Sequence, residues 1–503
     1  MQSADAEPVP TASLATAALT PEPLSLLDNT LRLFTEVRPG EGLTAVIMFA
    51  NVFLILCAYY LVKPLRDGWI AVSPIKGFSS VEVKACTSFA QSVALIGAMA
   101  LYARLATRLP RRELITRTTV FCISSLLVFW MLYHAQIAIA AIAFYIWVGI
   151  LGMFVVSQFW AFAADLYPDE RGRRIMPMIA IGGAAGAVAG SLGTEAVVRS
   201  NVLDSSTLLL LANIPLLASI ALTALADARG PTGQGSHPPG PRPPAVPTAT
   251  DGGKHIGVFA LVSGNRYLLA VAGITLLTNW VITNGDNLLF LNVQNTLATD
   301  LAARGGVDAA AMQVLVREGI TAFYGSFFFW VNLCALGLQA FVASRLLKYG
   351  GFGATLLLLP VIALFSQSAM AIVPLLLVVR VMKTAERSTA NSVNNTAQQV
   401  LWLPTTTEMK YKAKPAIDSF FVRVGDGLAA LTVLFGLRVY GLETRSLFAF
   451  NVVLVVLWFL LGVFVVREHH RLRALQRALA ATPHDSAGGD LALSLPISEP
   501  DAP

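Results

Sequence analysis

The chain has 503 residues, of which 55% are hydrophobic and only 13% are charged, and its formal net charge is +6. Soluble proteins carry about 25% charged residues, so this composition excludes an ordinary soluble globular protein and indicates a multi-span membrane protein. The positive charge does not indicate a nucleic-acid partner, because membrane proteins concentrate cations in their cytosolic loops.

The N-terminal segment, residues 1–41, is predicted to lie outside the membrane. Residues 1–22 are rich in Ala, Pro, Ser and Thr, with neither a basic start nor an apolar run, so they predict disorder and no cleavable signal peptide. Leu24, Leu27 and Leu31 follow at helical spacing, which predicts a short amphipathic helix at the cytosolic interface.

Long continuous apolar runs predict α-helical spans, because strands of a membrane barrel would instead alternate over about ten residues. The fifth run contains GGAAGAVAGSLG, whose small residues predict close packing against a neighbouring helix. It is not interpreted as a phosphate-binding loop, because the Lys-Ser/Thr of that motif is missing. Residues 42–226 are therefore expected to form a bundle of six helices, with spans near 42–62, 83–105, 115–133, 137–166, 175–198 and 208–226.

A Pro- and Gly-rich segment, residues 227–265, predicts a flexible cytosolic linker between two halves. The second half, residues 266–467, repeats the count of six, and the segment between its first two spans, 292–318, suggests a short extracytosolic helix. A cytosolic tail, 468–503, is expected to start as a basic helix with a solvated His469-His470 pair and to end in disorder. The six spans lie near 267–291, 320–346, 353–372, 374–403, 416–437 and 447–466.

Cations are more frequent in alternate loops, which predicts about twelve spans with both termini in the cytosol, in a bacterial inner membrane. Two six-helix halves joined by a cytosolic linker resemble the major facilitator group, whose sites lie near the bilayer midplane between the halves. The fold class expected is therefore an all-α membrane protein with a major-facilitator-like arrangement. Four separately placed cysteines and six histidines without a catalytic arrangement predict no metal, no cofactor and no enzyme.

The most polar stretch within the apolar regions is residues 379–426. One helical face of its first part carries three cations and then three amides, and a charge facing lipid is costly, so this face predicts a protein-lined, wet cavity. The alternative is that the run is a helix end followed by a cytosolic loop. The face comprises Arg380, Lys383, Arg387, Asn391, Asn394 and Gln398.

The first and seventh spans carry further candidates at corresponding positions. Lys63 and Arg66 can match an anion, although the alternative is that they snorkel to the outer surface. Tyr59 offers a ring to a planar solute, or else belongs to the interfacial aromatic belt. Asp286 lies within an apolar span, as a counter-charge to the cations or as a proton-coupling carboxylate.

Four more charged residues are predicted to form gates. Asp165 precedes a basic loop and is expected to bond Arg171 or Arg173 as a latch. Asp418, Arg423 and Asp426 open the eleventh span from the cytosolic side and are interpreted as an inner gate network.

Several stretches resemble the ATP/ADP exchangers, the nucleotide transporters of plastids and intracellular bacteria, and their wider bacterial relatives. They are AYYLVKPLRDGWIAV, SQFWAFAADLY with RGRRIMPMIAIGGAAGAVAG, and STANSVNNTAQQVLWLPTTTEMKYKAKPAIDSFFVRVGD. The sequence departs from these exchangers at the charged segment 63–67, which keeps two cations but exchanges their types, and at Ala390-Asn391 and Gln398-Gln399, where the family carries a lysine. Lysine and arginine are not interchangeable toward phosphate, so the resemblance implies transport more firmly than it implies ATP.

The function expected is secondary active transport of an anionic, phosphorylated solute by alternating access, with nucleotide exchange as the first candidate. Two alternatives stay open, a proton-coupled carrier of another organic solute and a non-transporting scaffold or sensor on the same fold. The partners expected are a small-molecule anion and the lipid bilayer, with no nucleic acid, and the protein is expected to be a monomer.

Overall fold

The computed structural model describes residues 41–73, 75–135, 137–167, 169–200, 202–229, 258–304, 308–406 and 409–481. The predicted amphipathic helix and disorder before residue 41, most of the predicted linker, and the disorder predicted at the end of the tail lie outside these residues.

The N-terminal half consists of helices that pack around one apolar core, in which Phe144 and Leu126 are fully buried. Its helices are α2 (Gly42–Ala71), α3 (Ser80–Arg108), α4 (Arg111–His134), α5 (Ala138–Leu166), α6 (Asp169–Arg199), α7 (Thr207–Leu211) and α8 (Asn213–Arg229).

The C-terminal half has its own core, built around Trp458 and Leu359. After the short helix α9 (Val258–Ser263), it contains α10 (Arg266–Arg304), α11 (Ala309–Leu338), η1 (Gln339–Ala343), η2 (Leu346–Gly350), α12 (Gly351–Ile372), α13 (Leu376–Thr389), η3 (Ala390–Asn394), α14 (Asn395–Leu401), η4 (Met409–Ala413), α15 (Lys414–Ala416), η5 (Ile417–Phe421), α16 (Val422–Leu434), η6 (Phe435–Val439) and α17 (Thr444–Ala481), where η marks π-helical turns.

Among the described residues, eleven helices are long and apolar enough to cross a membrane. The run α13–η3–α14 is a twelfth helical segment of similar length, and its charged side chains lower its hydropathy. The chain is thus a multi-pass α-helical membrane protein. The prediction of a separate short helix within residues 292–318 was wrong. These residues form the end of α10, which continues to Arg304, and the beginning of α11, which starts at Ala309.

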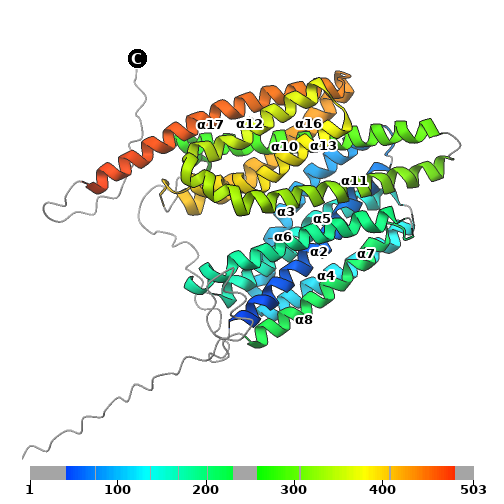
Figure 1. Cartoon of the computed structure of the whole chain (residues 1–503), viewed down its shortest axis with the longest axis horizontal. Helices are drawn as coiled ribbons and strands as arrows, with labels where there is room; N and C mark the ends of the chain where they lie inside the picture. Colours follow the sequence, from blue (N-terminus) through cyan, green and yellow to red (C-terminus); the bar gives the residue numbers. More distant parts are fainter. Residues whose placement is uncertain are drawn as a thin grey trace, which may run out of the picture.

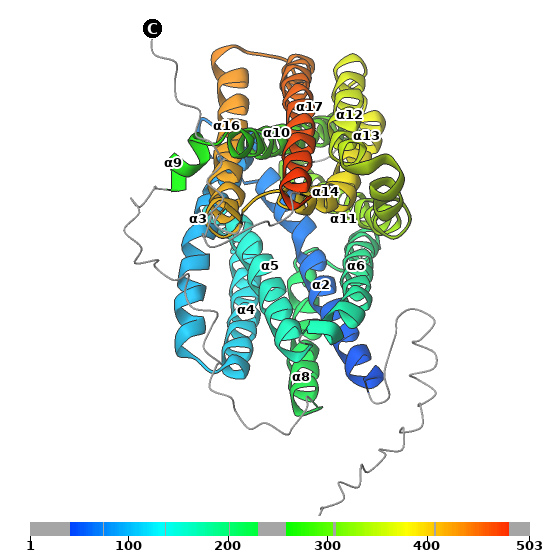
Figure 2. The same cartoon turned by 90° about the vertical axis from the view of Figure 1, so that its left-hand side faces the viewer.

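The two halves form two layers, with α2, α4, α5 and α8 in one and α10, α12, α16 and α17 in the other (Figure 2). A third apolar cluster joins them at one end of the bundle, where Ile70 and Val83 of the first half pack with Leu288 and Ile320 of the second. The start of α2 and the end of α17 lie at the opposite end (Figure 1).

The glycine run of α6 lets this helix lie directly against α2. A Cβ atom on Gly182 would lie 2.7 Å from the carbonyl oxygen of Phe49, and one on Gly186 would overlap that of Phe53. Small residues permit such close approach of helices in a membrane, so the packing predicted for this run is confirmed.

Substitution of Gly186 by alanine is expected to destabilise the protein by about 1–3 kcal/mol, because the added methyl group would force α6 away from the α2 backbone. The measurement is the apparent melting temperature of the protein in detergent. Gly97→Ala is the matched control, since a Cβ there meets no atom within 4 Å. Equal melting temperatures for the two variants would contradict the close packing.

Candidate functional site

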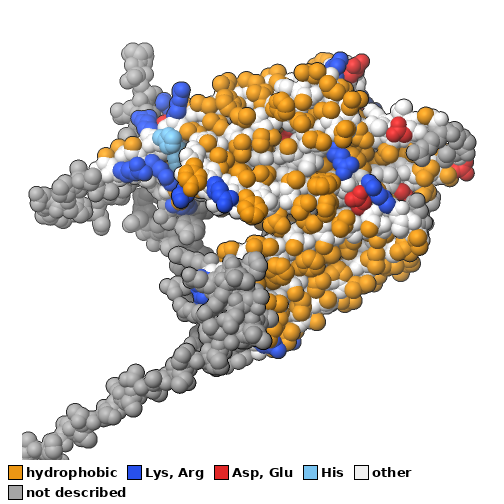
Figure 3. Space-filling view, in the orientation of Figure 1, with side chains coloured by type: hydrophobic (Ala, Val, Ile, Leu, Met, Phe, Trp, Pro, Cys, Tyr) orange, Lys and Arg blue, Asp and Glu red, His pale blue; other side chains and the backbone are white. Residues whose placement is uncertain are grey.

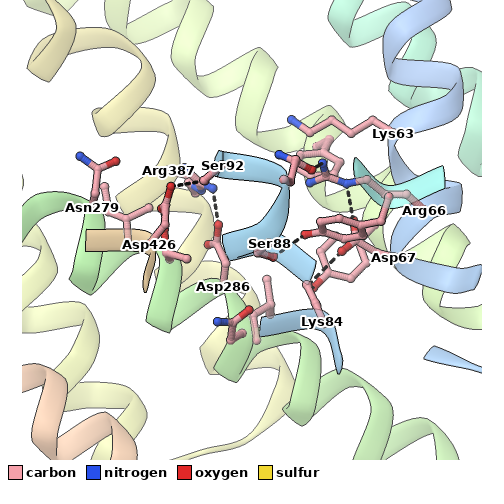
Figure 4. Close-up of a pocket in the computed structure, with 18 of the residues that line it drawn as sticks. Lys63, Arg66, Asp67, Lys84, Ser88, Ser92, Asn279, Asp286, Arg387 and Asp426 are labelled. Carbon is pink, nitrogen blue, oxygen red and sulfur yellow. Dashed lines mark hydrogen bonds and ion pairs between the residues drawn. The ribbon is translucent and has the colours of Figure 1, made fainter. Parts of the chain in front are cut away.

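A cavity of about 380 Å³ lies between the two halves. It falls in the range of roughly 300–1,000 Å³ that is usual for small-molecule sites. Five cationic side chains and three carboxylates line it, together with aromatic rings from α2, α5 and α11. The charged residues are Arg423 and seven that Figure 4 labels, namely Lys63, Arg66, Asp67, Lys84, Asp286, Arg387 and Asp426.

On the side of the N-terminal half, Asp67 holds two cations in place. Lys84 of α3 places Nζ 2.9 Å from one Asp67 oxygen, and Arg66 places Nε 3.4 Å from the other. The Arg66 guanidinium also lies over the Tyr145 ring, and Lys84 donates a hydrogen bond to the Tyr324 hydroxyl at 3.2 Å. Asp67 and Lys84 are buried, so this pair fixes the position of Arg66 at the cavity wall.

Lys63 differs from the other cations of the cavity. Its Nζ lies 4.2 Å from the ring centroid of Phe328, 4.7 Å from that of Tyr60 and 5.5 Å from that of Tyr59. Within the described part of the chain, no carboxylate lies at ion-pair distance from it. Aromatic faces, and no carboxylate of the described residues, therefore surround the ammonium group of Lys63.

On the side of the C-terminal half, Asp286 of α10 bonds the guanidinium of Arg387. Its other oxygen lies 3.3 Å from Nζ of Lys383, which also contacts Glu386 at 2.6 Å. Lys383 and Glu386 have fully buried side chains, whereas the Arg387 side chain is 32% exposed. Only Arg387 of these two cations therefore faces the cavity, and Lys383 supports Asp286 from behind.

A third group of charges connects the halves. Asp426 of α16 accepts hydrogen bonds from Ser92 of α3 and from Thr283 of α10, the second at 2.8 Å. Arg423 donates to Ser92 at 3.0 Å and lies 3.3 Å from Asp426. Because Ser92 belongs to the other half, these contacts must change if the halves move apart at this position.

The halves also meet at the end of the bundle away from the described chain termini. Arg317 of α11 lies 3.3 Å from Asp204 and over the ring of Tyr133, and the backbone N–H of Ser205 donates to Glu318 at 3.4 Å. At the other end, a hollow lies between the halves (Figure 3). The cavity is thus closed at one end by packed and ion-paired residues.

The structure brings five of the predicted binding residues together at the cavity, namely Lys63, Arg66, Asp286, Arg387 and Asn391. The other five do not line it, and they are Tyr59, Arg380, Lys383, Asn394 and Gln398.

Two geometrical causes separate these groups. Arg380 shares a helical face with Arg387 but lies two turns away, about 10 Å along the axis, where it donates to Ser326 at 2.6 Å. Beyond Asn391 the π-helical turn η3 changes the angular step between residues, which rotates Asn394 and Gln398 away from the cavity.

Of the four predicted gate residues, two line the cavity and two do not. Arg423 and Asp426 line the cavity, whereas Asp165 and Asp418 are exposed and lie outside it. Arg171, one of the two expected partners of Asp165, places its Nε 3.0 Å from Glu41 at the start of α2. A gating role for these residues stays a prediction.

Sequence reasoning missed the polar face of α3. Lys84, Ser88, Gln91 and Ser92 all line the cavity. Their spacing of four, three and one residues places them on one side of a helix, and a lysine within an otherwise apolar span is a recognisable signal.

No protein-family model matches the sequence, and no curated protein sequence matches it. Among solved structures, the fold is similar to that of the nucleoside transporter NupG, with a TM-score of 0.51 and 11% identity over 86% of this chain and 99% of that chain. It is also similar to a POT family transporter in complex with 5-aminolevulinic acid, with a TM-score of 0.55 and 12% identity over 85% of this chain and 96% of that chain. At these identities the likeness is one of fold, and the predicted all-α, major-facilitator-like fold class is confirmed.

Proposed function

We propose that this protein is a secondary active transporter that carries an anionic, phosphorylated solute by alternating access. The observation that carries the proposal is the surplus of cations in the cavity between the halves, above all Lys63, which no described carboxylate neutralises. An uncompensated charge in a low-dielectric cavity is costly, so a negatively charged ligand would be stabilised there.

The distribution of the cations supports a ligand that touches both halves. Lys63 and Arg66 approach from α2, while Arg387 and Arg423 approach from α13 and α16. Arginine forks suit phosphate or carboxylate oxygens, and a ligand with several such oxygens would contact both halves at once. The affinity for this ligand would then differ between conformations in which the two halves are arranged differently. Such a difference is required if ligand binding is to drive alternating access.

The closed end of the cavity, combined with the predicted orientation of the chain, supports an inward-facing conformation. The concentration of cations in alternate loops supports our inference that both termini lie in the cytosol, at a bacterial inner membrane. The end at which the halves meet through Arg317 and Asp204 would then face outward, and the hollow in Figure 3 would face the cytosol. The structure would correspond to an inward-facing state, and nothing in this arrangement needs more than one copy of the chain.

Nucleotide exchange is the first candidate for the transported solute. Tyr60, Tyr145 and Phe328 present rings at the cavity wall, and a nucleobase can stack on such faces while its phosphates meet the cations. The resemblance of the charged and polar stretches to the ATP/ADP exchangers supports the same class.

A proton-coupled carrier of another organic solute is a second candidate, because Asp286 is a partly exposed carboxylate at the cavity wall. In this case the ion pair of Asp286 with Arg387 would break on protonation and release the guanidinium. Asp286→Asn would then abolish the pH dependence of uptake, whereas an exchanger would retain its exchange.

The deciding experiment is counter-exchange in proteoliposomes that contain the purified protein and are loaded with ATP, ADP or phosphate. Uptake of labelled nucleotide is expected to increase when the same class of anion is inside, and the protein-free vesicle is the control. Absence of trans-stimulation by all three would refute nucleotide exchange. A flux of zero for every anion tested, under a pH gradient as well, would favour a non-transporting scaffold.

A further inference from the structure

A second cavity, of about 320 Å³, lies against the end of α17 that is nearer the hollow between the halves. Its walls come from α12 and from the part of α17 that follows the apolar stretch ending at Val466. Cationic and histidine side chains gather in this region, at the left-hand end of the molecule (Figure 3). The lining residues are Phe352, His469, His470, Arg473, Ala474 and Arg477.

His469 is built into the wall of this cavity and is not a solvated tail residue, so the prediction for this position was wrong. Its side chain is fully buried, its ring stacks on Phe352 with centroids 4.0 Å apart, and Nδ1 lies 3.2 Å from the Tyr267 hydroxyl. Tyr267 donates its proton to the carbonyl oxygen of Leu401 at 2.7 Å, so Nδ1 of His469 must donate to Tyr267. The other ring nitrogen, Nε2, is buried with no hydrogen-bond partner.

Two arginines of the same cavity also lack a countercharge among the described residues. Within the described residues, no carboxylate lies at ion-pair distance from Arg473 or Arg477. By contrast, Arg471 on another face of α17 lies 3.6 Å from Glu468. Considering the described residues alone, the cavity therefore combines two guanidinium groups that no carboxylate neutralises with a buried imidazole whose second nitrogen has no hydrogen-bond partner.

We propose that this cavity binds a phosphate group, carried either by an anionic membrane lipid or by a soluble phosphate compound. Arginine side chains bind phosphate oxygens in a bidentate way, and a phosphate would favour the protonated form of His469, whose Nε2 would then donate to the same group. The position fits a headgroup, because the cavity adjoins the end of an apolar helix, and basic pockets at that depth recognise anionic lipids.

The test uses the full-length protein in detergent, with native mass spectrometry to follow bound phosphatidylglycerol and phosphatidylcholine. A second arm measures the melting temperature of lipid-depleted protein with added inorganic phosphate. The variant Arg473→Gln/Arg477→Gln removes both guanidinium groups. Arg471→Gln is the matched control, because it removes a charge from the same helix outside the cavity.

If the ligand is a lipid, the wild type and the control retain phosphatidylglycerol in preference to phosphatidylcholine, and the double variant binds it about tenfold or more weakly. If the ligand is a soluble phosphate, inorganic phosphate raises the melting temperature of the wild type and the control but not of the double variant. Equal behaviour of the double variant and the control in both arms would overturn the proposal. Neither arm measures transport, so this result is independent of the proposed function.

Discussion

Lys383→Met is expected to destabilise the protein by about 3–5 kcal/mol, because it leaves a buried carboxylate without its cation. Nζ of Lys383 lies 2.6 Å from Glu386, and both side chains are fully buried. Methionine fills a similar volume, so the loss would come from the uncompensated charge of Glu386 and not from a cavity. The measurement is heat denaturation in detergent, followed by tryptophan fluorescence.

The double variant Lys383→Met/Glu386→Gln separates charge from packing. Glutamine keeps an oxygen that can accept from Gln367, which donates to Glu386 at 3.0 Å, and it removes the buried charge. Most of the lost stability should return in the double variant. Lys348→Met is the matched control for loss of a lysine, since Lys348 lies over the exposed ring of Tyr349. A Lys383→Met protein that melts like the wild type would show that this ion pair does not stabilise the fold.

The fold class was predictable because a bilayer imposes long apolar helices, which are visible in a sequence without knowledge of tertiary contacts. Helix ends were less predictable. The segment 292–318 is polar enough to suggest a separate element. In the structure it instead forms the last turns of α10 and the first turns of α11, so both helices extend past their apolar parts. Polarity marks where a helix leaves the membrane, but not where the helix itself ends.

The candidate site was predicted only in part, because periodicity gives the face of a helix but not its depth or its neighbours. The tenth span was correctly selected as polar and charged, and Arg387 lies at the cavity. Arg380 lies two turns away, and Lys383 faces Glu386 and Asp286 behind the wall. The π-helical turn η3 has no sequence signal of its own in this stretch, so the rotation of the residues after Asn391 could not be anticipated.

Lys63→Met is expected to lower the transport efficiency for the anionic solute about 10- to 100-fold, as lost contacts to a charged group cost about 1.5–3 kcal/mol. Methionine has a similar length and suits a site beside the Tyr60 and Phe328 rings, so folding should be preserved. The measurement is the initial rate of anion uptake into proteoliposomes over a range of concentrations, with the protein content of the vesicles determined in parallel.

The control must distinguish the charge of Lys63 from the general loss of a lysine above an aromatic ring. Lys348 lies 5.2 Å from the centroid of Tyr349, outside the cavity, so Lys348→Met removes the same chemical group and should leave uptake unchanged. Lys63→Arg keeps the charge and should recover part of the rate, with a different affinity because its geometry toward phosphate differs. Unchanged anion uptake by Lys63→Met would mean that the unpaired ammonium does not contact the solute, and the charge argument for an anionic substrate would fail at its central residue.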